Sequence, residues 1–194
     1  MTARFDKAVA LIDEANAADP NKVETGTGLR PAELVYGERM SETLGRLCPE
    51  ASELLQLAVR AQHLMRWTLP RSDFPMDRKG YHAWRNTAKR RHAEDVSKIL
   101  GNAGYSPDEI ETVQNLVLKV GLKRDDEAQT LEDVACLVFL EHYFSAFAAK
   151  HDHDKLIGIV RKTWAKMSDE GHTAALKLPL DDRSAKLVEE ALGE

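Results

Sequence analysis

The sequence predicts an all-α protein: a single-domain helical bundle of about seven or eight helices over residues 1–194. Apolar residues recur three and four positions apart through most of the chain, which is the spacing of helices with one buried face. No segment sustains the alternation of a strand. The longest apolar run, VACLVFL at residues 134–140, follows an acidic segment and suits a helix at the centre of a bundle.

Four helices are expected in the first half of the chain, over residues 4–18, 31–47, 49–67 and 81–100. Pro31 and Pro49 suit the first turns of the second and third. Residues 19–31 are rich in turn formers and are expected to form a loop. The Pro-rich segment 68–80 is expected to be either an ordered functional loop or a simple surface excursion.

Four more helices are expected over residues 107–119, 126–150, about 153–171 and 184–192. Ser106 and Glu109 form a capping box with Pro107 at the first helical position. The HDHD string at residues 151–154 is interpreted as a polar loop and helix start. Gly101 and Gly171 are expected to end the helices that precede them.

The charge of the chain is unevenly distributed. The net charge is −5, yet residues 60–98 contain ten Lys and Arg against four Asp and Glu. Such a segment is either a solvated helix face or an anion site, and the interleaved Trp, Tyr and Pro favour the anion site. No signal peptide and no apolar run of about 20 residues is present, so a cytoplasmic protein without a membrane partner is expected. The two distant cysteines fit a reducing compartment.

The predicted binding residues are cationic and aromatic. They are Arg60, Arg66, Trp67, Arg71, Arg78, Tyr81, Arg85 and Lys89. Guanidinium groups suit phosphate or carboxylate, and aromatic rings can stack on a base or sugar. The alternative is that the Arg stems cover apolar surface and that rings such as Trp84 belong to the core. Nucleic acid is a less favoured partner, because the chain is acidic overall and has no known binding motif.

Three groups on separate helices suggest a divalent metal ion: His63, His92 and Asp133. Two imidazoles and a carboxylate can bind such an ion and leave positions open for water and substrate. Arg60, His63 and Asp133 would then be catalytic. The alternative is that the histidines are hydrogen-bonded core residues and that Asp133 is a helix cap or an ion-pair partner.

Several blocks of the sequence resemble an uncharacterised family known only as a domain of unknown function. They are ELVYGERM, ASELLQLAVRAQHLMRW, GYHAWR, HAEDVSKIL, LEDVACLVFLE and KTWAKMS, and the resemblance covers nearly the whole chain. Members sometimes carry a glutamyl-tRNA synthetase label, but the chain is short and lacks the nucleotide-binding signature of a synthetase.

More distantly, the layout is similar to HD-type metal-dependent phosphohydrolases, which are all-helical. The resemblance implies that His63 stands at the histidine of the His-Asp pair and Asp133 at the late aspartate. Leu64 replaces the aspartate of the pair, and the 34–47 segment has Arg39 or Met40 where a histidine is expected. Two ligands are therefore missing, so either His92 compensates or the metal centre is lost and the fold kept for binding.

Three functions follow as expectations. The first is an HD-like, degenerate or intact, phosphohydrolase acting on a phosphorylated small molecule or nucleotide. The second is a non-catalytic anion- or nucleotide-binding module. The third is an interaction protein that docks an acidic partner through its Arg and Trp surface. The site is expected between the helices at residues 52–67, 81–100 and 126–150.

Overall fold

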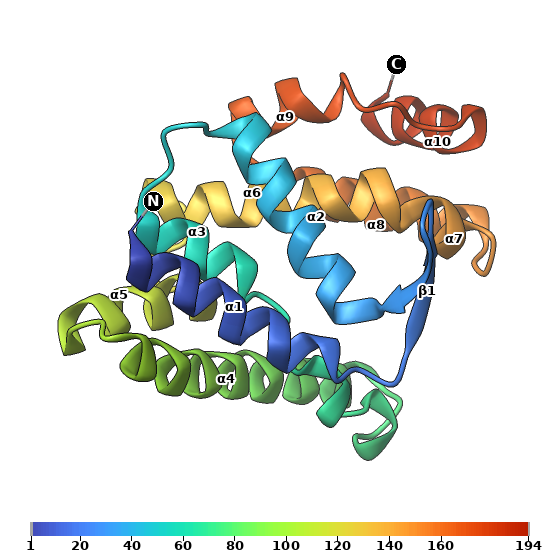
Figure 1. The fold of residues 1–194 in the computed structure, drawn as a ribbon. Helices are drawn as coiled ribbons and strands as arrows, with labels where there is room; N and C mark the ends of the chain where they lie inside the picture. Colours follow the sequence, from blue (N-terminus) through green and yellow to red (C-terminus); the bar gives the residue numbers. More distant parts are fainter. Residues whose placement is uncertain (1, 194) are drawn as a thin grey trace.

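A computed structural model describes residues 2–193 and confirms the all-α prediction (Figure 1). Its α-helices are α1 (Ala3–Ala17), α2 (Ala32–Leu47), α3 (Glu53–Arg60), α4 (Arg78–Ala103), α5 (Pro107–Leu118), α6 (Asp126–His142), α7 (Phe144–Ala148), α8 (His153–Trp164), α9 (Asp169–Ala175) and α10 (Asp182–Leu192). The shorter elements are strands β1 (Lys22–Thr25) and β2 (Gly28–Pro31) and the 3₁₀ turns η1 (Arg66–Thr68) and η2 (Arg71–Asp73). Within residues 2–193, every helix is too short or too polar to cross a bilayer.

Helix α6 is the central element of the fold. In Figure 1 it runs between α4 on one side and α9 and α10 on the other. Its side chains enter two apolar clusters: Leu131 and Val134 pack with α1 to α5, and Leu137 and Leu140 pack with α7 to α10. The apolar run at residues 134–140 is therefore buried on both sides, as its composition predicts.

Side-chain caps define where most helices begin. Ser106 and Glu109 form the predicted capping box at the start of α5. Asp77 accepts from the backbone N–H of Gly80 at the start of α4, and Asp152 accepts from Lys155 at the start of α8. Each such cap contributes about 1 kcal/mol and satisfies an otherwise unpaired donor.

Residues 22–31 form a β-hairpin where the sequence predicts only a loop. The strands pair antiparallel from Lys22 with Pro31 to Thr25 with Gly28. The buried Asp19 links this hairpin to α2, because its carboxylate accepts from the backbone N–H groups of both Asn21 (2.9 Å) and Glu33 (3.0 Å). This contact fixes the first turn of α2.

The predicted helix through residue 67 is wrong beyond residue 60. Helix α3 ends at Arg60, and the chain enters a tight turn over residues 62–65 in which Met65 has a φ of 50°. The Met65 N–H donates to Asn16 Oδ1 (2.9 Å), and the Leu64 carbonyl lies 2.7 Å from His92 Nδ1. Side chains from α1 and α4 thus replace the hydrogen bonds of a continuing helix and support a backbone conformation that is costly for a non-glycine residue.

Two other expected helices are each divided in two, which raises the number of α-helices above the predicted seven or eight. The 126–150 segment is interrupted at Tyr143, between α6 and α7. The segment expected to end at Gly171 forms α8 and α9 instead, with Gly171 in the first turn of α9. A Cβ at Gly171 would lie 2.8 Å from the Asp133 carboxyl group, so close packing rather than helix termination explains this glycine.

Candidate functional site

The turn at residues 62–65 places His63 against α2. The His63 ring stacks on Tyr36, with centroids 3.9 Å apart and planes 11° from parallel. Its Nδ1 lies 3.4 Å from Glu33 Oε2, and its ring centroid lies 6.1 Å from that of His92. His63 is therefore held between α2 and the buried His92 of α4.

Burial favours the neutral forms of His63, His92 and Glu33 by shifting their pKa values. Burial, together with the positive charge of Arg66, lowers the pKa of His63 well below its ordinary range. Burial lowers the pKa of His92 to about 4. Burial also raises the pKa of Glu33 to about 7, although Arg66 opposes this shift. At neutral pH the contact between Glu33 and His63 is thus not an ion pair, because the imidazole carries no charge.

Two arginines beside His63 lie against aromatic rings rather than carboxylates. The guanidinium carbon of Arg66 lies 4.5 Å from the ring centroid of Trp84, and that of Arg85 lies 5.8 Å from that of Tyr81. The Trp84 indole is itself fixed by donating to the Leu69 carbonyl (2.9 Å). Neither arginine makes a side-chain hydrogen bond or ion pair within residues 2–193. Their N–H groups are therefore oriented by cation–π contacts and left available to a ligand.

Three lysines extend this positive region around a single carboxylate. Lys89 follows Arg85 by one turn of α4, and its pKa is lowered by burial and by the charges of Lys119 and Arg85. Lys119 pairs with the buried Glu132, and Lys166 Nζ lies 3.6 Å from the other oxygen of the same carboxylate. Burial opposes ionisation of Glu132, yet Lys119 and Lys166 lower its pKa. One carboxylate therefore balances two ammonium groups.

We call these five side chains the cation cluster: Arg66, Arg85, Lys89, Lys119 and Lys166. They come from η1, α4, the end of α5 and the segment after α8. The carboxyl groups of Glu33 and Glu132 interact with them. A half-buried excess of positive charge favours an anion, because the surrounding protein screens it less than water does.

Two of the predicted binding residues have structural roles instead. Arg60 donates two hydrogen bonds of 2.7 Å to Asp13 and a longer one to Ser41, which joins α3 to α1 and α2. Arg71 donates to the carbonyls of Phe74, Pro75 and Asp77 and so closes the loop before α4. The predicted catalytic role of Arg60 is not supported, because its guanidinium is already bound by a carboxylate.

The remaining predicted binding residues lie around the cation cluster or on the nearby surface. Trp67 is half-buried in η1, next to Arg66. Arg78 is exposed at the start of α4, and Tyr81 is 41% exposed beneath Arg85. Of the predicted binding residues, Arg66, Arg85 and Lys89 belong to the cation cluster, and the binding roles stay a prediction.

The structure gives the three predicted metal ligands other partners. Asp133 Oδ1 accepts from the Ser168 N–H (2.8 Å) and from Gln129 (3.0 Å), and Oδ2 accepts from the Ser168 hydroxyl (2.6 Å). His92 bonds the Leu64 carbonyl. Within residues 2–193, no group of three His, Cys, Asp or Glu side chains is placed to hold an ion. His92 and Asp133 instead match the alternative interpretation, a core histidine and a carboxylate at a helix terminus, while metal binding by the protein stays a prediction.

Five residues in and around the cation cluster were not predicted from the sequence. They are Glu33, Tyr36, Lys119, Glu132 and Lys166. Four of them lie in the blocks that carry the family resemblance: ELVYGERM, LEDVACLVFLE and KTWAKMS. Lys119 had no signal, because its role depends on an αL conformation (φ 60°) at the end of α5.

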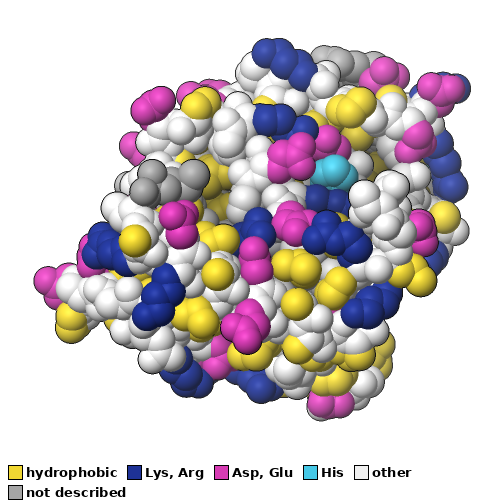
Figure 2. All heavy atoms as spheres, viewed as in Figure 1, with side chains coloured by type: hydrophobic (Ala, Val, Ile, Leu, Met, Phe, Trp, Pro, Cys, Tyr) yellow, Lys and Arg dark blue, Asp and Glu magenta, His cyan; other side chains and the backbone are white. Residues whose placement is uncertain are grey.

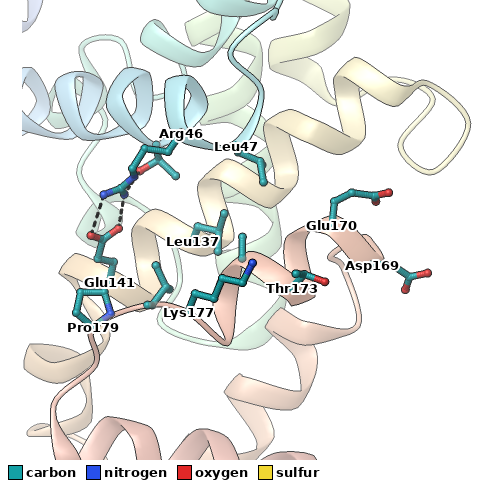
Figure 3. A pocket seen from close by; sticks show the side chains of 12 residues that line it. Arg46, Leu47, Leu137, Glu141, Asp169, Glu170, Thr173, Lys177 and Pro179 are labelled. Atoms are coloured by element: carbon teal, nitrogen blue, oxygen red, sulfur yellow. Dashed lines mark hydrogen bonds and ion pairs between the residues drawn. The ribbon is translucent and has the colours of Figure 1, made fainter.

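The structure also contains a cavity of about 670 Å³ between α2, α6 and the α9 region, shown in Figure 3. Leu47 and Leu137 contribute apolar lining, and the rim pair Arg46 and Glu141 is joined by two hydrogen bonds. None of the predicted site residues lines it.

On the face in Figure 2, acidic and basic side chains are interspersed rather than gathered into one basic patch. The cation cluster is therefore the candidate site.

Comparison with known proteins gives one match. A family model described as "Domain of unknown function (DUF4202)" matches residues 6–188. No curated protein matches the chain. No solved structure matches it either.

Proposed function

Because the chain belongs to this family of unknown function, whose model spans residues 6–188, we propose a function from the site itself. The protein binds a phosphorylated small molecule or a nucleotide, and the cation cluster holds its phosphate. This is the binding alternative among the functions expected from the sequence. It requires no metal and no role for Arg60 or Asp133.

The observation that carries the proposal is the pairing of Arg66 with Trp84 and of Arg85 with Tyr81. A structural arginine is usually neutralised by a carboxylate, as Arg60 is by Asp13. An arginine held by an aromatic face keeps its full charge and its planar set of donors, which match phosphate oxygens in a bidentate manner. Burial lowers the pKa of Arg66, so a bound anion would relieve a real desolvation cost.

Titration calorimetry with inorganic phosphate and with nucleoside monophosphates tests the proposal. Arg66→Met and Arg85→Met keep an apolar stem against Trp84 and Tyr81 but remove the charge. Each is expected to weaken binding about tenfold or more, because a hydrogen bond to a charged group is worth about 1.5–3 kcal/mol.

Arg90→Met is a matched control, since Arg90 is exposed on α4. It should leave the affinity unchanged. An equal loss in this control, or no loss in the Arg66 and Arg85 variants, would exclude the cation cluster as the binding site. If only acidic peptides bind the cluster, the third expected function, docking of an acidic partner, replaces the proposal.

A phosphohydrolase is the second candidate, and the contact between Glu33 and His63 favours it. A neutral imidazole next to a phosphate site can accept a proton from water as the water oxygen attacks phosphorus. The ester oxygen then leaves with the electron pair of the broken P–O bond and takes a proton from solvent. Glu33 and Tyr36 would orient the His63 ring.

A panel of nucleotides and sugar phosphates, assayed with and without Mg²⁺ or Mn²⁺, separates hydrolysis from binding. If the protein is a hydrolase, His63→Gln should abolish turnover while phosphate affinity stays within about threefold of wild type. Absence of phosphate release under all ion conditions rejects this candidate and leaves the binding function.

A further inference from the structure

Two cations of the cluster are spaced along one helix. Arg85 and Lys89 are four residues apart on α4, so they share a face and are separated by about 6 Å along the helix axis. Arg66 lies over Trp84, the residue that precedes Arg85. Lys119 and Lys166 both contact the Glu132 carboxylate.

The net charge of the cation cluster also favours a ligand with more than one phosphate group. Five cations face the carboxyl groups of Glu33 and Glu132, which leaves an excess of three positive charges when both carboxyls are ionised. Glu33 has a pKa raised to about 7 by burial, so the excess at neutral pH is larger still. A single phosphate group, with at most two negative charges near neutral pH, leaves part of this excess unbalanced.

Lys89 is the lysine of the cluster that has no carboxylate partner within ion-pair distance among the described residues. It is half-buried, and within residues 2–193 it makes no side-chain hydrogen bond or ion pair. Burial and the charges of Lys119, Arg85 and Lys166 disfavour its ammonium form and lower its pKa, and the charge of Glu132 offsets this only in part. A second anionic group beside Lys89 would remove this penalty.

We propose that the cation cluster binds a ligand with two or more linked phosphoryl groups, one held by Arg66 and Arg85 and the next by Lys89. This rests on the phosphate-binding function proposed above and defines its ligand class. Linked phosphates supply a row of anionic oxygens, which matches charges spaced along a helix better than a compact anion does.

Calorimetry at constant ionic strength in metal-free buffer, with orthophosphate, pyrophosphate and tripolyphosphate as probes, tests this inference. Pyrophosphate is expected to bind at least about tenfold more tightly than orthophosphate. Lys89→Met should weaken pyrophosphate binding about fivefold or more and change orthophosphate binding less than about twofold. Arg90→Met, the adjacent exposed cation on α4, should change neither.

The possible outcomes distinguish the preference for linked phosphates from the phosphate-binding function on which it rests. Equal affinities for orthophosphate and pyrophosphate, or equal losses for both in Lys89→Met, overturn the inference. If Arg66→Met still abolishes orthophosphate binding in that case, the phosphate site itself stands. Failure of all three probes to bind overturns both. Unchanged melting temperatures of the variants show that the losses do not come from unfolding.

Discussion

The Asp133 carboxylate is bound by Ser168 through two hydrogen bonds, from its backbone N–H at 2.8 Å and from its hydroxyl at 2.6 Å. Asp133 is 2% exposed on the central helix α6, and Ser168 directly precedes α9. The hydroxyl of Ser168 also accepts from the Gly171 N–H, so the chain of contacts runs from α6 into the first turn of α9. The buried Asp133 carboxylate, which the sequence predicts as a site residue, therefore joins α6 to α9.

Asp133→Ala is expected to lower the free energy of unfolding by about 3 kcal/mol, because half-buried donors on Ser168 and Gln129 lose their acceptor. Phosphate affinity should stay within twofold of wild type, since Asp133 is not part of the cation cluster. Urea denaturation and calorimetry measure the two quantities. Asp133→Asn keeps an acceptor oxygen and should lose less. A variant of normal stability that no longer binds phosphate would contradict this role.

His92 supports the turn that carries His63 and Arg66. His92→Ala leaves the buried Leu64 carbonyl without its donor, so the free energy of unfolding should fall by about 1–3 kcal/mol. Phosphate affinity should fall as well, because the turn at residues 62–65 loses one of its two side-chain restraints. His92→Asn, which can place an N–H donor near the Nδ1 position, should recover much of both losses. If Ala and Asn behave alike, the hydrogen bond is not the restraint.

The raised pKa of Glu33 predicts a pH-dependent effect on stability. The unfolded chain releases this proton near pH 4.5 and the folded protein near pH 7, so the stabilising contribution of Glu33 is lost as the pH rises through this window. Glu33→Gln should therefore gain stability relative to wild type between these values, by up to about 3 kcal/mol. Denaturant titrations at several pH values measure this difference.

His92 provides an internal check, because its effect has the opposite sign. Its pKa falls from 6.5 to about 4 on folding, so its contribution is present above pH 6.5 and is lost as the pH falls through that window. His92→Asn should remove this loss at acid pH. A Glu33→Gln difference that does not change with pH would show that the Glu33 carboxyl is not desolvated.

Gly80 and Gly101 lie on the same helix and predict opposite responses to alanine. A Cβ at Gly80 would lie 2.0 Å from the Pro75 carbonyl oxygen, whereas nothing lies within 4 Å of one at Gly101. Gly80→Ala should cost about 1–3 kcal/mol by forcing the loop before α4 away from the helix. Gly101→Ala should stabilise by up to about 1 kcal/mol, because alanine is the better helix former. Thermal melts compare the melting temperatures of the two variants with that of wild type. A stabilised Gly80→Ala would contradict the close packing of Gly80 against Pro75.

Local signals explain the parts of the fold that the sequence predicted. The capping box at Ser106 and the apolar periodicity of most segments depend only on neighbouring residues, and both are confirmed. The turn at residues 62–65 depends on Asn16 and His92, which are distant in sequence, so helical periodicity alone could not reveal it. The hairpin at residues 22–31 was missed because strands of four residues are too short to establish an alternation.

The site was predicted only in part for a related reason. Residue type identified Arg66, Arg85 and Lys89, but it could not distinguish them from Arg60. What separates these residues is the partner that each one meets: Asp13 for Arg60, and aromatic faces for Arg66 and Arg85. Such partners are set by tertiary packing, and no spacing rule along the chain encodes them.

A positive cluster inside a chain of net charge −5 has a kinetic consequence. At low salt, where screening is weak, a multiply charged anion meets the repulsion of the whole protein before it meets the cluster. Added salt should therefore raise the association rate constant, since it screens that repulsion. The same salt should raise the dissociation rate constant by weakening the contacts at the cluster. A protein that binds nucleic acid through a broad basic surface instead associates more slowly as salt increases.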